Sequence, residues 1–364
     1  MKKKNIRIVV LIAIVAFVCI GLGIYKIGTA IYHYSLTHIS MTDTERNELW
    51  NAQPDGYGFP YENGWSSVDL WPYHVENEEN TLVRLEAPSS FIVNNAEDMP
   101  ILDGAEAAYP VYSAFALNCY KDIATIQSDS TTGTAPIRFT NTIEAYKKLL
   151  SGEIDIFFGA QPSEKQKQMA KAQNKELKLT PIAQEGFIFF VSKDNAVDDL
   201  SSQQIRSIYS GEYTNWKAVG GENIPILAFQ RPENSGSQTM MQYFMGDTEL
   251  KEPLQVEWAD GMGTVLKKVA NYQNKKSAIG YSFRYYATKM ENSYQDDIKL
   301  LSVDGVYPTA ENIANGKYPI TTTLYAITLA DNPKASVTPF LEWMQSEQGQ
   351  AIIEKTGYVV VNNQ

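Results

Sequence analysis

The chain has 364 residues and a formal net charge of −11, with 44% hydrophobic and 20% charged residues. This composition is typical of a globular protein that is large enough for two domains or two lobes. The acidic balance argues against a surface that binds nucleic acid or an anionic membrane, so an anion would have to be bound by local donors rather than by the overall field.

The N-terminus combines a basic cluster, KKKNIR at residues 2–7, with an uninterrupted apolar run at residues 8–25. The apolar run is just long enough to span a bilayer as a helix. The basic cluster should stay in the cytoplasm and direct the rest of the chain outside. A cleaved signal peptide, with Gly28 and Ala30 at the cleavage site, is the alternative. We predict an uncleaved single-pass anchor in the cell membrane, with the body of the protein on the extracytoplasmic side.

Residues 26–82 are predicted to form an extracytoplasmic spacer. This segment is rich in Tyr, Trp, Asn and Gly, and its stretch NAQPDGYGFPYENGW at 51–65 indicates turns rather than regular structure. Packing of the same segment against the main body is the alternative.

From about residue 82 the pattern changes to alternating helices and short strands. Apolar residues recur at helical spacing, and Thr142 and Ser163 stand at helix starts as caps. Helices are expected at 107–123, 142–152, from 163 onward, 201–211, 264–272 and 337–358. Strands are expected just after Gly152 and at 186–194, 278–283 and 321–329. Such alternation predicts α/β sheets flanked by helices.

The stretch FQRPENSGSQTMMQYFMG at 229–246 places an arginine just before a short polar loop and a helical run. The first N–H groups of a helix have no intrahelical partners and carry the positive end of the helix dipole, so they can bind an anion. Gly236 permits close backbone approach, Ser235 and Ser237 add hydroxyl donors, and Arg231 offers a planar fork to an oxyanion. The loop therefore predicts an anion site, with a simple capped helix as the alternative.

Residues for catalysis or metal binding are scarce. Cys19 and Cys119 divide between the apolar segment and the body, so no intrachain disulfide is expected. The three histidines, His33, His38 and His74, precede the α/β region, which argues against zinc hydrolases and Ser-His-Asp enzymes. We therefore predict a protein that is not an enzyme and that holds no metal and no cofactor.

Several segments follow one another in a recognisable order: DGAEAAYPVYSAF, FTNTIEAYKKLLSGEIDIFFGAQPSEKQ, GFIFFVSKDNAVDDLSSQQIRSIYSGEYTNW, FQRPENSGSQT, SAIGYSF and SEQGQAIIEKTGYVVV. From about residue 95 onward the chain resembles the phosphate-binding proteins of Pst-type ABC importers. The resemblance implies a type 2 periplasmic-binding-protein fold, in which two α/β lobes joined by two crossing strands close on a ligand. Lobe one would comprise 83–188 and 323–364, and lobe two 189–322.

The resemblance also implies ligand-binding residues in both lobes. In lobe two, Arg231 matches the arginine of the family, and the Ser-Gly-Ser run matches a Ser-Gly-Thr that donates hydroxyl and N–H bonds. In lobe one, a hydroxyl at a helix start and the loop after Asp103 would complete the site. The implied set is Arg231, Ser235, Gly236, Ser237, Thr140, Thr142, Glu106 and Ala107.

Two positions depart from the family pattern. The loop after Asp103 reads Ala105-Glu106-Ala107, where the family has small and hydroxyl residues. The family also places an acid that accepts the proton of hydrogen phosphate near GAQPS, and this chain has no carboxylate there. Asp155 matches a different, structural acid of that stretch.

Three interpretations of Glu106 remain open. An ionised Glu106 about 4 Å from phosphate would repel it by roughly 4 kcal/mol at an effective dielectric near 20, which would imply a changed ligand. Glu106 could instead replace the missing acid, accept the phosphate proton and so exclude sulfate. Or its side chain points to solvent and leaves Ala107 with the backbone N–H groups at the ligand.

These observations predict a solute-binding protein that captures inorganic phosphate or a close oxyanion as a monomer and presents it to the permease of an ABC importer. The alternative is a membrane-anchored surface sensor or interaction module that kept the fold but binds another ligand or none.

Overall fold

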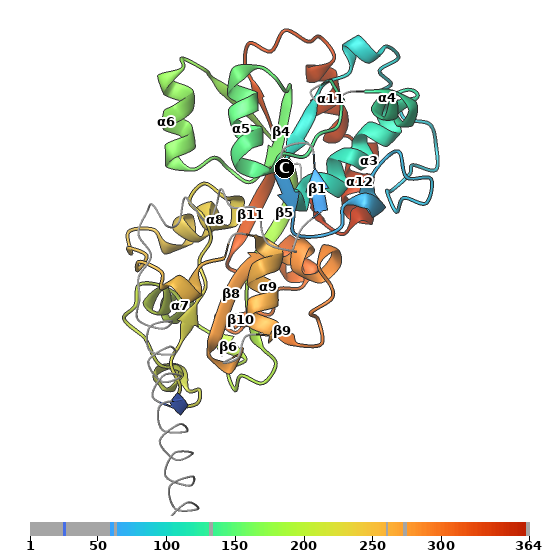
Figure 1. Ribbon diagram of the computed structural model, residues 1–364. Helices are drawn as coiled ribbons and strands as arrows, with labels where there is room; N and C mark the ends of the chain where they lie inside the picture. Colours follow the sequence, from blue (N-terminus) through green and yellow to red (C-terminus); the bar gives the residue numbers. More distant parts are fainter. Residues whose placement is uncertain are drawn as a thin grey trace, which may run out of the picture.

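The computed structural model describes residues 25–26, 59–61, 64–130, 134–259, 261–271 and 275–361. Within these residues the chain forms two α/β lobes, one above the other in Figure 1, with strands β5 (Leu177–Ser192) and β11 (Thr321–Leu329) near their junction. The expected two-lobed α/β fold is therefore confirmed.

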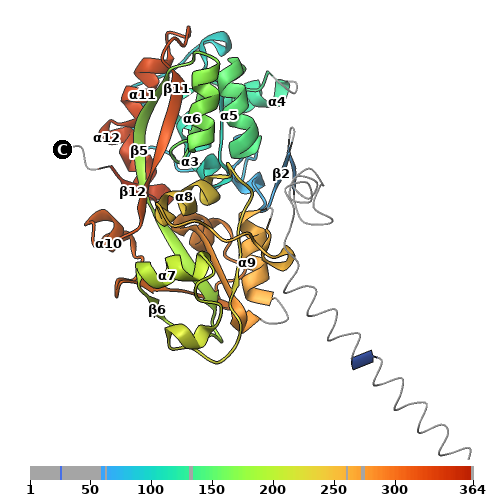
Figure 2. The ribbon, with the colours of Figure 1, turned by 90° about the vertical axis from the view of Figure 1, so that its left-hand side faces the viewer.

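Lobe one is a sheet with helices on both sides, as Figure 2 shows. Its strands are β3 (Leu102–Gly104), β4 (Ile156–Gly159), β11, the first part of β5 and β12 (Val359–Val360). Its helices are α3 (Tyr109–Cys119), α4 (Ile123–Asp129), α5 (Asn141–Ser151), α6 (Glu164–Ala172), α11 (Val337–Met344) and α12 (Glu347–Thr356). A single 3-10 turn, η3 (Glu106–Ala108), precedes α3.

Lobe two is built around the second part of β5. Its strands are β7 (Leu227–Ala228), β8 (Ala278–Phe283), β9 (Ile298–Leu300) and the small pair β6 (Asp199–Leu200) and β10 (Ser302–Val303). Its helices are α7 (Ser202–Tyr209), α8 (Gly236–Met245), α9 (Met262–Asn271) and a π-helical turn, η7 (Tyr286–Met290). The short helix α10 (Ala310–Ala314) precedes β11.

Strand β5 belongs to the sheets of both lobes. Residues Leu177–Gly186 pair antiparallel with β11, and residues 187–191 pair antiparallel with β8. The sequence predicts this strand only from residue 186 onward, so residues 177–185 of β5 were not expected. Proline disfavours a continuous ladder, and this strand contains Pro181, which pairs with Tyr325 where β11 shifts register. The change of partner at Gly186 marks the crossing between the lobes.

Most predicted helices are present, with two corrections. The prediction of one terminal helix over 337–358 is wrong, because Ser346 caps a second helix by accepting a hydrogen bond from Gly349 N–H. The prediction that Thr142 caps its helix is also wrong. Asn141 adopts a left-handed φ of 64°, and its side chain accepts a hydrogen bond from Ile143 N–H at 3.1 Å. The hydroxyl of Thr142 is thereby left for other partners.

The segment before lobe one is partly built into it. Val68, Leu70, Val75 and Leu82 are buried in the main hydrophobic cluster. The short turn η1 (Trp71–Tyr73) packs against α3. For residues 68–82, packing on the main body is therefore what the structure shows, rather than a free spacer.

The predicted membrane segment at 8–25 lies outside the described residues, apart from Tyr25. None of the helices formed by the described residues has the length and apolar character needed to cross a membrane.

Candidate anion-binding site

Two helix starts from opposite lobes meet in the cleft. Helix α5 of lobe one begins next to Thr142, and helix α8 of lobe two begins at Gly236. A β-carbon placed on Gly236 would lie 3.6 Å from Oγ1 of Thr142 and 3.7 Å from the ring of Phe283. Side-chain caps bind some N–H groups of both first turns, Ile143 N–H through Asn141 and Gln238 N–H through Ser235, and the positive ends of the two dipoles converge on one place.

The start of α8 carries two buried hydroxyl groups. Ser235 caps the helix, because its Oγ accepts a hydrogen bond from Gln238 N–H at 3.4 Å, and its own O–H remains available as a donor. Ser237 is 1% exposed, and its Oγ has no hydrogen-bond partner among the described residues. A buried hydroxyl without a partner costs free energy, and an anion at the helix start would provide an acceptor.

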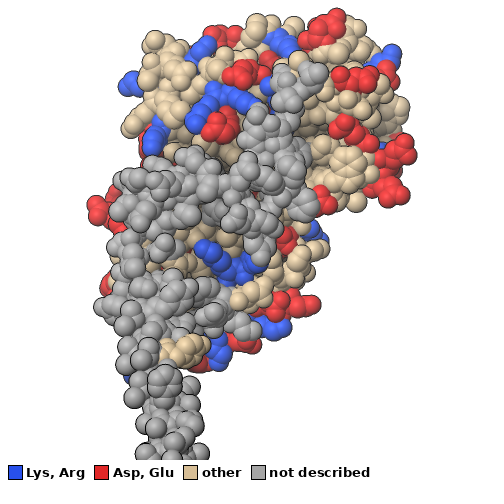
Figure 3. Space-filling view, in the orientation of Figure 1, with Lys and Arg blue, Asp and Glu red and all other residues tan. Residues whose placement is uncertain are grey.

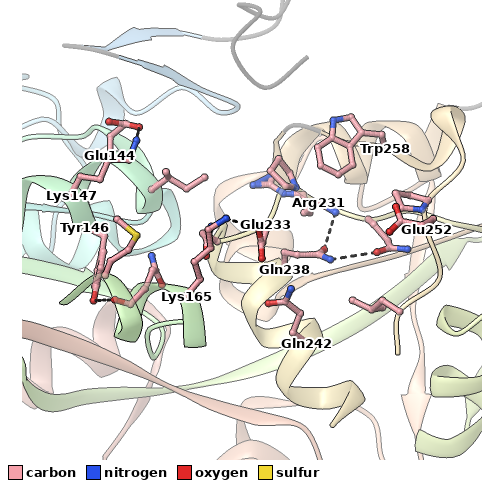
Figure 4. Close-up of a pocket in the computed structure, with 18 of the residues that line it drawn as sticks. Glu144, Tyr146, Lys147, Lys165, Arg231, Glu233, Gln238, Gln242, Glu252 and Trp258 are labelled. Carbon is pink, nitrogen blue, oxygen red and sulfur yellow. Dashed lines mark hydrogen bonds and ion pairs between the residues drawn. The ribbon is translucent and has the colours of Figure 1, made fainter. Parts of the chain in front are cut away.

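Arg231 lies on the lobe-two wall of the cleft with 8% of its surface exposed. Its backbone N–H donates to Oε1 of Gln238 at 3.0 Å and to the hydroxyl oxygen of Tyr281 at 3.1 Å. Tyr281 in turn donates to Gln238, and burial raises the pKa of Tyr281, so the phenol keeps its proton. This network fixes the backbone from which the guanidinium projects, and Figure 4 shows the bond between Arg231 and Gln238.

Thr140 is bonded to Asp103 of strand β3. Its hydroxyl donates to Oδ2 of Asp103 at 2.6 Å, and its N–H donates to Oδ1 at 2.9 Å. Burial raises the pKa of Asp103 to about 6, although hydrogen bonds from Thr140 and Gly104 act in the opposite direction. Thr140 therefore serves to hold the loop after β3, and Thr142 is the hydroxyl that faces the other lobe.

Glu106 is buried, with 9% of its surface exposed, so the interpretation that it points to solvent is wrong. Its Oε1 accepts a hydrogen bond from Ser67 N–H at 2.5 Å, and its Oε2 accepts one from Ser67 Oγ at 2.8 Å. The neighbouring carbonyl of Ala107 accepts a hydrogen bond from the Tyr358 hydroxyl at 2.7 Å. Nothing in the sequence pattern identified Ser67 as a partner of this acid, because the two residues are 39 positions apart.

Asp155 is bonded within lobe one. It accepts a hydrogen bond from Ile101 N–H at 2.8 Å and forms an ion pair with Lys334 at 3.0 Å. Within the described ranges, no group of three or more His, Cys, Asp or Glu side chains has the arrangement of a metal site.

Direct contacts hold the lobes together beside the two helix starts. Ser163 Oγ donates to Oδ1 of Asn234 at 2.8 Å, and Lys165 forms an ion pair with Glu233 at 2.9 Å. Both pairs join the start of α6 in lobe one to the loop before α8 in lobe two. The ion pair is exposed and contributes little by itself, but the buried serine contact requires the lobes to be close.

A groove of about 720 Å³ opens between the lobes beside Arg231. In Figure 4, Glu144, Tyr146 and Lys147 lie on its lobe-one side, and Arg231 and Trp258 lie on its lobe-two side. On the face shown in Figure 3, acidic and basic side chains are interspersed over both lobes. With a net charge of −11, the chain depends on local donors rather than on its overall field to attract an anion.

Comparison with known proteins agrees with this architecture. The family profile described as "PBP superfamily domain" matches residues 101–348, which is more than half of the chain. The chain belongs to the PBP superfamily. The resemblance to Pst-type phosphate-binding proteins that the sequence indicated is confirmed by its curated relatives.

Two relatives of this PBP superfamily member are named phosphate-binding protein PstS. The protein from Borreliella burgdorferi is 31% identical over 50% of this chain and 65% of its own length. The protein from Bacillus subtilis is 32% identical over 50% of this chain and 57% of its own length. The chain thus spans less than two thirds of the length of these two curated relatives.

A solved structure from Clostridium perfringens, described as a phosphate ABC transporter substrate-binding protein with bound phosphate, is also similar. Its sequence is 28% identical, its TM-score is 0.56, and the match covers 72% of this chain and 99% of that one. A phosphate transport receptor from Vibrio cholerae, at 20% identity and a TM-score of 0.53, shares the fold.

Proposed function

We propose that this protein captures phosphate, or a close oxyanion, in the cleft between its lobes and delivers it to an ABC importer. The observation that carries the proposal is the meeting of the α5 and α8 helix starts at Thr142 and Gly236, beside Arg231. A tetrahedral oxyanion placed there would accept bonds from both lobes at once. Binding would then favour the closed arrangement, because only that arrangement brings both sets of donors together.

The proposed donors are Arg231 and the Ser235 and Ser237 hydroxyls, the N–H groups at the start of α8, and the hydroxyl of Thr142 from lobe one. Ser235, Ser237 and Arg231 are all buried, so their bonds to a charged ligand would be weakly screened. The relatives named as phosphate-binding proteins support phosphate as the ligand. Capture of phosphate by these donors involves no catalytic step.

We further propose that residues 8–25 anchor the chain in the cell membrane and that the body lies on the extracytoplasmic side. The support is the basic cluster at residues 2–7 followed by the apolar run. An extracytoplasmic receptor with a membrane anchor would stay close to its permease, which raises the effective concentration of the pair.

The decisive experiment is calorimetric titration of the full-length chain, solubilised in a mild detergent, with phosphate and then sulfate. We expect phosphate binding at micromolar or tighter dissociation constants. Ser237→Ala and Thr142→Val should each weaken phosphate binding about 10- to 100-fold, because each removes a donor to a charged acceptor. Ser210→Ala is the matched control, since Ser210 Oγ donates to the Ser207 carbonyl and should not affect affinity. No heat from either anion in folded protein would contradict the proposal.

One observation favours the alternative of a sensor or interaction module. Glu106 stands where the family has a small or hydroxyl residue, and its buried carboxylate is bound by Ser67 of the N-terminal segment. A protein that had lost phosphate binding would show no heat on titration with phosphate. Arg231→Gln would then give the same titration result as wild type.

A further inference from the structure

Ser67 lies between the two lobes and contacts both. Toward lobe one, its N–H and its Oγ each donate to a different oxygen of Glu106, at 2.5 Å and 2.8 Å. Glu106 opens the 3-10 turn that leads into α3, so its negative charge lies at the positive end of that helix. The two donors from one residue hold this carboxylate in a single orientation.

Toward lobe two, Ser67 meets the start of α9 and the π-helical turn η7. Its Oγ lies 2.7 Å from the hydroxyl of Tyr286 and accepts a hydrogen bond from Gly263 N–H at 3.2 Å. A β-carbon on Gly263 would lie 3.0 Å from the β-carbon of Ser67, and one on Gly261 would lie 3.2 Å from it. Both glycines thus leave room for Ser67 to approach this helix start.

The segment that carries Ser67 is packed on lobe one. Val68, Leu70 and Val75 are buried in the main cluster, and the turn that follows Leu70 packs on α3. Figure 2 shows strand β2 (Gly64–Ser66), which leads into Ser67, at the level where the lobes meet above α9. If the lobes separate, Ser67 keeps its bonds to Glu106 and loses those to Tyr286 and Gly263.

The chemistry of Tyr286 suits this contact. Tyr286 is fully buried, and burial, followed by the charge of Glu106, raises its pKa well above the ordinary value. The phenol therefore keeps its proton, and it can donate to Ser67 Oγ while that hydroxyl donates to Glu106. The chain of bonds runs from lobe two through Ser67 to lobe one.

We propose that Ser67 is an interlobe latch: a positioning residue of the N-terminal segment whose bonds to Tyr286 and Gly263 form when the lobes close, so that closure and the N-terminal segment depend on each other. The proposal rests on the proposed function in one respect, namely that phosphate closes the lobes. Through this latch, ligand capture stabilises residues 64–70, and these residues in turn raise the affinity for ligand.

The test combines hydrogen exchange and titration on the full-length chain in detergent. Without phosphate, Ser67→Ala should speed amide exchange in the first turn of α9 only in proportion to the fraction of molecules whose lobes close spontaneously, because only in that closed form does Gly263 N–H lose its acceptor. With inorganic phosphate, wild-type protein should show slower exchange at residues 64–70 and in that turn, and Ser67→Ala should lose the effect. Its phosphate affinity should fall about 3- to 10-fold, as expected for one neutral hydrogen bond network.

Two further variants keep the result interpretable. Gly263→Ala should displace Ser67 by steric contact and reproduce the effects of Ser67→Ala. Thr81→Ala is the matched control, because the Thr81 hydroxyl donates to the Pro72 carbonyl within the same segment and does not reach lobe two. If Ser67→Ala and Thr81→Ala are indistinguishable in exchange, the latch is overturned, even if phosphate binds. If wild-type protein binds no phosphate but Ser67→Ala still speeds exchange in α9, the proposed function fails and the interlobe contact stands.

Discussion

Thr142 of lobe one and Gly236 of lobe two face each other so closely that a β-carbon on Gly236 would touch the threonine hydroxyl, at 3.6 Å. Each residue belongs to the first turn of its helix. The contact therefore joins two helix dipoles that come from opposite sides of the hinge.

Gly236→Ala should separate binding from stability. Gly236 does not have a positive φ, so alanine fits the helix backbone, and the free energy of unfolding should stay unchanged or rise by up to about 1 kcal/mol. The added methyl group would occupy the space between the helix starts, and phosphate affinity should fall at least about tenfold. Calorimetry and urea unfolding measure the two effects.

Gly152→Ala provides the opposite pattern as a control. Gly152 ends α5 with φ of 79°, and no atom lies within 4 Å of its β-carbon position. Alanine there should cost about 1 kcal/mol of unfolding free energy through backbone strain and leave affinity unchanged. Equal losses of phosphate affinity in Gly236→Ala and Gly152→Ala would show that the ligand does not occupy the space beside Gly236.

Arg231→Gln should abolish measurable phosphate binding or weaken it at least about 100-fold, because a buried charge-assisted contact to the ligand is removed. The backbone network of Arg231 with Gln238 and Tyr281 does not depend on the side chain, so the fold should persist. Arg84→Gln, on the exposed surface of lobe one, is the control for loss of one positive charge. If Arg231→Gln binds phosphate as tightly as wild type, the anion binds at a place that does not include Arg231.

Thr140→Val should lower stability rather than directly remove a ligand contact. The variant deprives buried Asp103 of a hydroxyl donor, which we expect to cost about 1–3 kcal/mol of unfolding free energy. Phosphate affinity should change less than about threefold. Thr142→Val should instead weaken phosphate affinity and leave the free energy of unfolding nearly unchanged. If instead Thr140→Val loses affinity without losing stability, the role implied by the family resemblance holds at Thr140.

Glu185, next to the crossing between the lobes, predicts a pH effect on stability. Burial raises its pKa from 4.5 to about 7, against the opposing effect of Arg284 and the N–H donors of Gly186 and Tyr285. The Glu185 carboxyl group therefore binds its proton more tightly in the native state than in the unfolded state. The stability contributed by Glu185 is full below pH 4.5 and is lost as the pH rises through about 7.

Glu185→Gln imitates the protonated form at every pH. We expect the variant and the wild type to differ little at about pH 4.5, and the variant to gain relative stability as the pH rises to about 8, on the order of 3 kcal/mol at most. Urea unfolding across this range measures the difference. If the difference in unfolding free energy between Glu185→Gln and wild type does not change with pH, Glu185 stays ionised beside Arg284.

The sequence predicted the lobe-two half of the candidate site better than the lobe-one half. In lobe two the arginine, the cap and the glycine lie within one short stretch, so local helix-start chemistry identifies them together. In lobe one the decisive facts are long-range. The pairing of Thr140 with Asp103 and that of Glu106 with Ser67 join residues 37 and 39 positions apart, which no local pattern specifies.

The distinction between local patterns and long-range contacts also explains which strands the sequence predicted. Strands β8 and β11 begin and end where their apolar runs predict, because the local hydrophobic pattern specifies both. The sequence does not predict the first part of β5, because Pro181 and the mixed sequence around it obscure a strand that pairs along its length with β11.

Strand β5 passes from one sheet into the other without a break, from Leu177 to Ser192. A connection made of loops would let the lobes swing in several directions, whereas a strand with partners before and after Gly186 resists sliding and permits mainly bending and twisting. A lobe motion guided by this strand would bring Thr142 and Gly236 opposite each other each time the cleft closes.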